Sequence, residues 1–263
     1  MNRILILMLF LSACTPKIIN VESVDLVSEH YTHIGLDVLG QTYMYSEVEL
    51  IRNSIRQDST LSFSTKGTES LSHISFSNPN KLTVFIKDSQ ELWILDSSLS
   101  LVEEIDLRAF EKGDIGFATR LIDNRMLIYS RSQKQLFKYN NNRNLVYETD
   151  LLWNLEGEVI DLVQSQDQFI LLTDSGQLLL FDDYGNFMQE LKIDVKNNPI
   201  ALYKNLLYFL DRETKKVHYI DLSDPIAKQQ TLPIELEDKI DDFAVEMNKI
   251  YFLKNSKINK QSF

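Results

Sequence analysis

The stretch that decides the fold is Gln168–Ile193, QFILLTDSGQLLLFDDYGNFMQELKI. It contains two short apolar runs, Phe169–Thr173 and Leu178–Phe181, and then a looser alternating segment, Phe187–Ile193. Residues rich in Asp, Gly and Asn separate these three segments, and such residues favour tight turns because Asp bonds its own backbone and Gly tolerates positive φ. The stretch therefore predicts three antiparallel strands joined by two turns.

The same strand–turn–strand unit recurs along the chain, as VFIKDSQELWILD, LIYSRSQKQLFKYN, YFLDRETKKVHYID and YFLKNSKINK, with a degraded early copy in YMYSEVELIRN. An Asp or Asn closes the second strand of the unit at intervals of 39 to 44 residues: Asn53, Asp96, Asn140, Asp182 and Asp221. A period of about 40 residues built from short strands is typical of β-propeller blades. We predict an all-β, six-bladed β-propeller, while five or seven blades, or a β-sandwich, remain alternatives.

The predicted blades cover residues 31–64, 71–107, 116–150, 158–195, 199–234 and 241–261. The last of them has three predicted strands before the chain reaches Phe263, whereas the strand-like segment Lys17–Val21 belongs to no blade. An open strand edge carries unpaired N–H and C=O groups. We therefore expect Lys17–Val21 to close the ring as the fourth strand of the last blade, in a single domain that spans 14–263.

The N-terminus reads as a targeting signal. Arg3 precedes an apolar run, Ile4–Ala13, which is too short for a membrane-spanning helix and suits a secretory signal. The run ends in Leu-Ser-Ala followed by Cys14, the single cysteine of the chain. This pattern resembles the bacterial lipobox. The resemblance implies that 1–13 is a signal peptide, that Cys14 is lipidated, and that the domain is anchored in the cell envelope. Thr15 at the next position favours the outer membrane, facing the periplasm.

Composition and motifs exclude several classes of function. The net charge is −11 with 38 acidic and 27 basic residues, which argues against a nucleic-acid partner, because neutralising phosphates needs basic residues. The sequence contains no GxSxG, GxGxxG, P-loop, CxxC or HExxH motif. We therefore expect no cofactor, no metal and no catalytic residues, and favour a binding module over an enzyme.

Five side chains on or beside predicted innermost strands are candidates for lining the central channel: His33, Asp37, His73, Asp161 and Asp242. Histidines on these strands could approach one another in the channel, but hydrogen-bonded core histidines fit the pattern as well. In propellers of the lactonase and paraoxonase type, inner-strand carboxylates hold calcium, a cation that prefers six to eight oxygen ligands. Here the positions vary from blade to blade, so a metal remains only an alternative.

The repeat resembles the six-bladed NHL-type propellers, and with the lipobox it is similar to propeller lipoproteins of bacteria. Asp37–Gln41 is a near copy of the NHL turn, Asp-x-x-Gly-Asn, and most blades lack its glycine. The resemblance implies a membrane-anchored, non-catalytic scaffold for protein partners. A fold hosts many functions, so a lactonase-like hydrolase, or a small-ligand or glycan binder that uses the channel, is the alternative.

Overall fold

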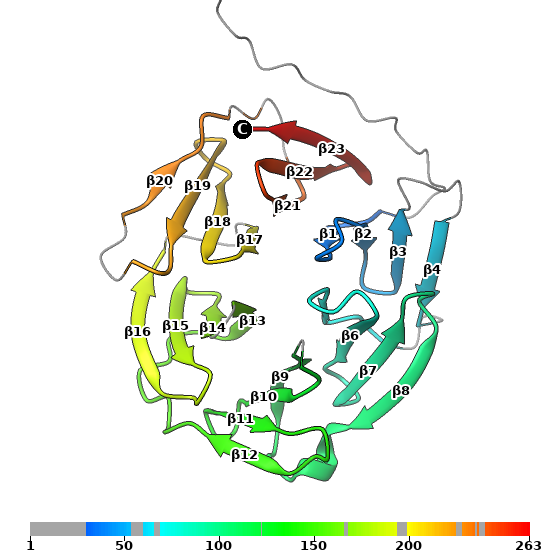
Figure 1. Cartoon of the computed structure of the whole chain (residues 1–263), viewed down its shortest axis with the longest axis vertical. Helices are drawn as coiled ribbons and strands as arrows, with labels where there is room; N and C mark the ends of the chain where they lie inside the picture. Colours follow the sequence, from blue (N-terminus) through cyan, green and yellow to red (C-terminus); the bar gives the residue numbers. More distant parts are fainter. Residues whose placement is uncertain are drawn as a thin grey trace, which may run out of the picture.

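The computed structural model describes residues 30–53, 60–65, 69–121, 123–165, 168–193, 199–224, 228–234, 236 and 240–263. In this part of the chain six antiparallel sheets stand around a central axis, and the strands of each sheet follow one another from the axis outward (Figure 1). The prediction of an all-β propeller with six blades is confirmed. No helix among the described residues is long and apolar enough to cross a membrane.

The strand bounds follow the predicted repeat. Blade 1 contains β1 (His33–Leu36), β2 (Thr42–Tyr45), β3 (Glu49–Asn53) and β4 (Thr60–Ser64). Blade 2 contains β5 (His73–Ser75), β6 (Lys81–Ile86), β7 (Glu91–Asp96) and β8 (Leu101–Asp106), followed by a 3-10 turn, η1 (Leu107–Phe110). Blade 3 contains β9 (Ile115–Arg120), β10 (Met126–Ser130), β11 (Gln135–Tyr139) and β12 (Leu145–Glu148).

The second half of the ring repeats the plan with two shorter sheets. Blade 4 contains β13 (Val159–Ser165), β14 (Gln168–Thr173), β15 (Gln177–Asp182) and β16 (Phe187–Lys192). Blade 5 contains β17 (Ile200–Tyr203), β18 (Leu206–Asp211), β19 (Lys216–Asp221) and the short β20 (Gln230–Thr231). Blade 6 contains β21 (Asp242–Glu246), β22 (Lys249–Lys254) and β23 (Lys257–Ser262). The outer strand of blade 5 was predicted to reach Ile234, but β20 ends at Thr231, and one further backbone bond, from the Leu232 N–H to the Val217 carbonyl at 2.8 Å, follows it.

The Asp or Asn that marks the repeat caps the turn between the third and fourth strands. Asp96 Oδ1 accepts hydrogen bonds from the backbone N–H groups of Ser98 and Ser100 at 2.8 and 2.9 Å. The side chains of Asn140 and Asp182 accept from their second and fourth following residues in the same way. These bonds stabilise a left-handed residue in each turn, which is Gly in only one of the three blades. The chain therefore turns tightly with few glycines.

Apolar clusters fill the seams between the blades. Six clusters of buried side chains occur in the described part of the chain, and each draws on two neighbouring blades. The cluster between blades 6 and 1 includes Ile34, Met44, Tyr251 and Leu253, so the first and last sheets pack directly against each other. Most of the strand aromatics, such as Tyr43, lie in these seams and form the core. The predicted ring-closing strand Lys17–Val21 lies outside the described residues.

Candidate functional site

Four of the five predicted channel residues form two His–Asp pairs. His33, His73 and Asp242 are the first residues of the innermost strands β1, β5 and β21, and Asp161 lies near the start of β13. His33 Nδ1 lies 3.5 Å from Asp242 Oδ2. Asp242 also accepts hydrogen bonds from the backbone N–H groups of Ile34 at 3.0 Å and Phe243 at 2.9 Å. This carboxylate therefore connects blade 6 to blade 1 across the seam that closes the ring.

The second pair joins blades that are not neighbours. His73 Nδ1 of blade 2 lies 3.8 Å from Asp161 Oδ1 of blade 4, and the His73 ring lies 4.4 Å, between centroids, from Phe117 of blade 3. Asp161 Oδ1 also accepts a hydrogen bond from the Leu162 N–H at 2.8 Å. Contact between blades 2 and 4 means that these side chains reach across the axis at the end of the ring where the inner strands begin.

Burial governs the titration of the second pair. It lowers the pKa of His73, and the nearby charge of Asp161 only partly offsets this effect. Burial also raises the pKa of Asp161, and the charge of Asp242 adds to that rise. Both effects favour the neutral forms of the two side chains. Tyr45, whose ring stacks on His33 at 4.9 Å, has a pKa raised by burial and by the charges of Asp242 and Asp161.

A His–Asp pair is a common unit of general acid–base chemistry, but at 3.5 and 3.8 Å the two pairs are ion-pair contacts and not hydrogen bonds. Among the described residues, no group of three or more His, Cys, Asp or Glu side chains could hold a metal ion. The His–Asp pairs alone therefore supply too few ligands for a calcium site.

The fifth predicted channel residue, Asp37, joins neither pair. Asp37 is 4% exposed and caps the turn between β1 and β2, where its carboxylate accepts from the N–H groups of Leu39 and Gln41 and from the Tyr43 hydroxyl. These bonds occupy both of its oxygens, which gives it a structural role in the turn. Cys14 lies outside the described residues.

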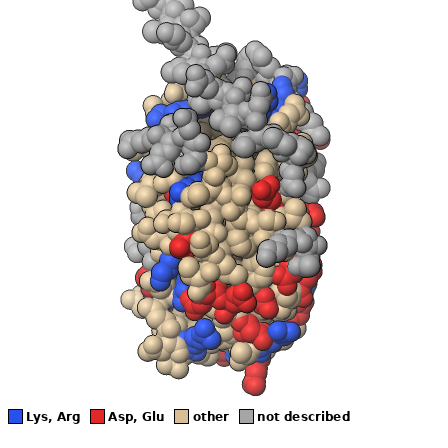
Figure 2. Space-filling view, turned by 90° about the vertical axis from the view of Figure 1, so that its right-hand side faces the viewer, with Lys and Arg blue, Asp and Glu red and all other residues tan. Residues whose placement is uncertain are grey.

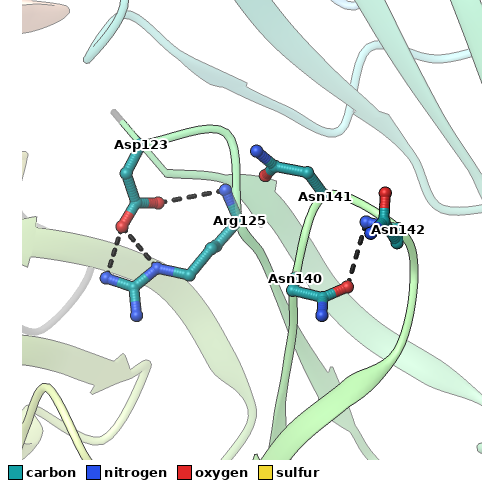
Figure 3. A pocket seen from close by; sticks show the side chains of 5 residues that line it. All are labelled: Asp123, Arg125, Asn140, Asn141 and Asn142. Atoms are coloured by element: carbon teal, nitrogen blue, oxygen red, sulfur yellow. Dashed lines mark hydrogen bonds and ion pairs between the residues drawn. The ribbon is translucent and has the colours of Figure 1, made fainter.

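A shallow hollow of about 380 Å3 lies on the face of blade 3, lined by Asp123, Arg125, Asn140, Asn141 and Asn142 (Figure 3). Three of its lining side chains already have partners. Arg125 forms ion pairs with Asp123 and with Asp183 of blade 4, and Asn140 caps its own turn. The hollow therefore belongs to the turns of blade 3 and presents few free groups to a ligand.

Exposed apolar side chains gather on the outer strands of three consecutive blades. The first two residues of β8, β12 and β16 are apolar and between 37% and 57% exposed, and we call this set the apolar rim: Leu101, Val102, Leu145, Val146, Phe187 and Met188. In each of these blades the register between the third and fourth strands shifts at the two apolar residues. A bulge of this kind leaves two residues opposite one. Both can then face solvent.

The fold does not require apolar residues at this place. In β4 of blade 1 the polar residues Thr60, Ser62 and Ser64 alternate outward, whereas Leu61 and Phe63 pack toward the core. In blade 5 both residues of the outer strand, Gln230 and Thr231, are polar and exposed. Blades 2 to 4 follow one another along the lower rim in Figure 1. Figure 2 shows the side of the disc formed by β4 and β8, where acidic side chains gather below a broad uncharged area.

The loop that leads from blade 3 to blade 4 carries another exposed apolar residue, Trp153, which is 79% exposed. Sequence reasoning assigned outer strands to blades 2 to 4 but did not single out the apolar rim or Trp153. The available signal was an apolar pair directly after the capped turn, LV, LV and FM, in three successive repeats. Lys138, whose buried amine contacts Asp183 of the next blade, was also missed, because its partner is 45 residues away.

No family model matches the chain, and no curated protein sequence does either. Solved structures share the fold. Virginiamycin B lyase from Staphylococcus aureus is 12% identical with a TM-score of 0.59, over 88% of this chain and 79% of that one. BamB from Moraxella catarrhalis is 12% identical with a TM-score of 0.53, over 89% and 85%. The Swd1 propeller domain from Myceliophteria thermophila is 9% identical with a TM-score of 0.61, over 93% and 99%. At these identities the likeness establishes the β-propeller fold alone.

Proposed function

We propose that this protein is a membrane-anchored, non-catalytic scaffold that binds protein partners in the bacterial cell envelope. One observation carries the proposal: apolar side chains are exposed at the same position of three consecutive blades, where other blades place polar ones. Larger patches of exposed apolar side chains mark interaction sites, because their exposure to water is unfavourable and they do not contribute to the core. The propeller supplies a rigid support for such a surface.

The anchor is the second part of the proposal. Lipidation of Cys14 would hold the domain at a membrane, which we place at the periplasmic face of the outer membrane. Each buried CH2 of an acyl chain contributes about 0.8 kcal/mol, and stable attachment needs more than one chain. Only Thr15 and Pro16 separate Cys14 from the predicted ring-closing strand Lys17–Val21, so with that strand in place the propeller would stay near the lipid surface.

Two measurements test this function. The full chain and the Cys14→Ser variant are each expressed, and the cells are separated into membrane and soluble fractions. The full chain should be found with the membranes, whereas Cys14→Ser should be found in the soluble fraction. Photo-crosslinking residues placed at Trp153 and at Tyr184, two strongly exposed aromatic positions, should then trap a protein in the membrane-anchored form. Recovery of the chain alone with every crosslinker position, in mild detergent and in intact cells, would refute the scaffold function.

The channel supports a second candidate, a small-ligand binder or lactonase-like hydrolase. The observation in its favour is the half-buried His73–Asp161 pair, because a histidine and a carboxylate in proximity can serve as proton donor and acceptor. A catalytically inactive virginiamycin B lyase solved with quinupristin also shares the fold, at 10% identity and a TM-score of 0.60. Incubation with quinupristin and with simple lactones, followed by mass spectrometry, tests this candidate. Turnover that His73→Phe abolishes would favour it over the scaffold.

A further inference from the structure

An acidic row accompanies the apolar rim. Glu104 of β8, Glu148 of β12 and Glu190 of β16 each stand two residues after the second apolar residue of the strand, and each is exposed. The outer strands thus repeat the pattern apolar–apolar–x–Glu in blades 2, 3 and 4: LVEE, LVYE and FMQE. Because the strands occupy equivalent places in their sheets, the three glutamates form a row beside the apolar rim.

Neighbouring cations only partly offset the charge of this row. The charge of Lys192 acts on Glu190, but its ammonium pairs with Glu156 at 3.0 Å. Lys112 Nζ lies 3.9 Å from Glu148, a long contact for an ion pair, and Glu190 accepts a hydrogen bond from the neutral amide of Gln177 at 3.1 Å. The guanidinium of Arg120 is directed to Glu103, the residue before Glu104, at 2.8 Å. The rim therefore combines a row of apolar side chains with a row of carboxylates.

The negative charge beside the apolar rim limits which partners can bind there. A second copy of the chain would bring one acidic row against another, and an anionic lipid surface would be repelled in the same way. We propose that the apolar rim binds a segment of another protein whose apolar residues are bordered by Lys or Arg, with the apolar residues on the rim and the cations on Glu104, Glu148 and Glu190. This inference rests on the proposed scaffold function and names the chemistry of its partner.

Matched synthetic peptides test the chemistry directly. One peptide of about 18 residues, or five helical turns, contains leucine and lysine. The second peptide has the same length and pattern, with glutamate in place of lysine. Fluorescence anisotropy with the folded domain should show binding of the lysine peptide, and binding of the glutamate peptide at least about tenfold weaker, a difference of about 1.4 kcal/mol. Equal binding of the two peptides would overturn the proposal.

Variants locate the binding. Val102→Ser, Val146→Ser and Met188→Ser together should weaken the lysine peptide about tenfold or more, and Glu104→Lys, Glu148→Lys and Glu190→Lys together should reverse the preference between the peptides. The matched control adds three lysines to other blades, Thr60→Lys, Ser62→Lys and Gln230→Lys, and should keep the preference. All these residues are exposed, and an unchanged melting temperature shows that the variants fold. A control as strongly affected as the rim variants would contradict the assignment to the rim.

Crosslinking in cells separates this proposal from the function on which it rests. With a photo-crosslinker at Val102, Val146 or Met188, mass spectrometry of the trapped peptide should identify apolar residues flanked by Lys or Arg. Trapping of an acidic segment would refute the charge argument. Trapping at Trp153 but at no rim position would refute the rim and leave the scaffold function standing, whereas no trapping at any position would refute both.

Discussion

In the ion pair between Lys138 and Asp183, mutation of Asp183 should destabilise the protein much more than mutation of Lys138. Lys138 of β11 is 0% exposed and its Nζ lies 2.6 Å from Asp183 Oδ1 and 3.0 Å from the Asp183 carbonyl, in the turn between β15 and β16 of the next blade. The same amine lies 4.7 Å from the centre of the Phe169 ring. Burial lowers the pKa of Lys138. The charged amine therefore depends on Asp183 for its stability in this seam.

The two single variants should differ in size. Asp183→Asn leaves a buried cation without its counter-ion, which typically costs about 3–5 kcal/mol. Asp183 is 30% exposed and its carbonyl remains, so we expect about 3 kcal/mol, the lower end of that range. Lys138→Met removes the charge but keeps the apolar stem, and Asp183 retains Arg125 at 3.3 Å. Because Asp183 is 30% exposed and keeps this partner, it is not left as an unpaired buried charge, and we expect a loss of less than about 1 kcal/mol, as for a surface ion pair.

Urea unfolding of the wild type, both single variants and the double variant measures these values. The double variant should resemble Lys138→Met, so that the coupling between the two sites is about 3 kcal/mol, the whole loss expected for Asp183→Asn. Asp183→Asn should also lower the melting temperature by roughly 6–12 °C, at about 2–4 °C per kcal/mol for a domain of this size. Equal losses for the two single variants would show that the cation gains its stability elsewhere and would refute the reasoning.

Three further predictions concern the channel and the ends of the chain. The pKa of His73 is lowered in the folded state, so the unfolded chain binds more protons below about pH 6.5, and the free energy of unfolding should fall as the pH drops through that value. Urea unfolding between pH 7.5 and 5 should show a smaller fall in this free energy for His73→Phe than for the wild type. The same pH dependence in both proteins would contradict the lowered pKa of His73. Asp242→Ala leaves the buried N–H of Ile34 without its acceptor and should cost about 1–3 kcal/mol by denaturant unfolding, whereas a loss below about 0.5 kcal/mol would mean that the contact contributes nothing net to the closing seam. A chain that begins at residue 22 should unfold at a lower temperature than one that begins at residue 15, because it lacks the predicted ring-closing strand Lys17–Val21, and identical melting curves would rule out that strand.

The fold was predictable because its signal is local and repeated. The capping residues Asp96, Asn140 and Asp182 mark the end of each third strand, and the apolar runs between them alternate with turn residues. The partners of the channel residues were less accessible to prediction. His33 and His73 were expected on inner strands, and the structure places them there, but their partners Asp242 and Asp161 come from blades 6 and 4. Asp37 was also expected in the channel because it lies beside an inner strand, but its side chain instead accepts hydrogen bonds from the backbone of its own turn.

The sequence by itself determined the repeat of about 40 residues, most of the strands within it and the capped turns, because hydrogen bonds between residues close in the chain fix those features. Only the tertiary structure decided which side chains meet across the axis, which amine is buried between blades 3 and 4, and which apolar residues stay exposed on the rim. Those contacts depend on the curvature of the closed ring. That curvature brings residues such as Ile34 and Asp242, separated by 208 positions, within one hydrogen bond of each other.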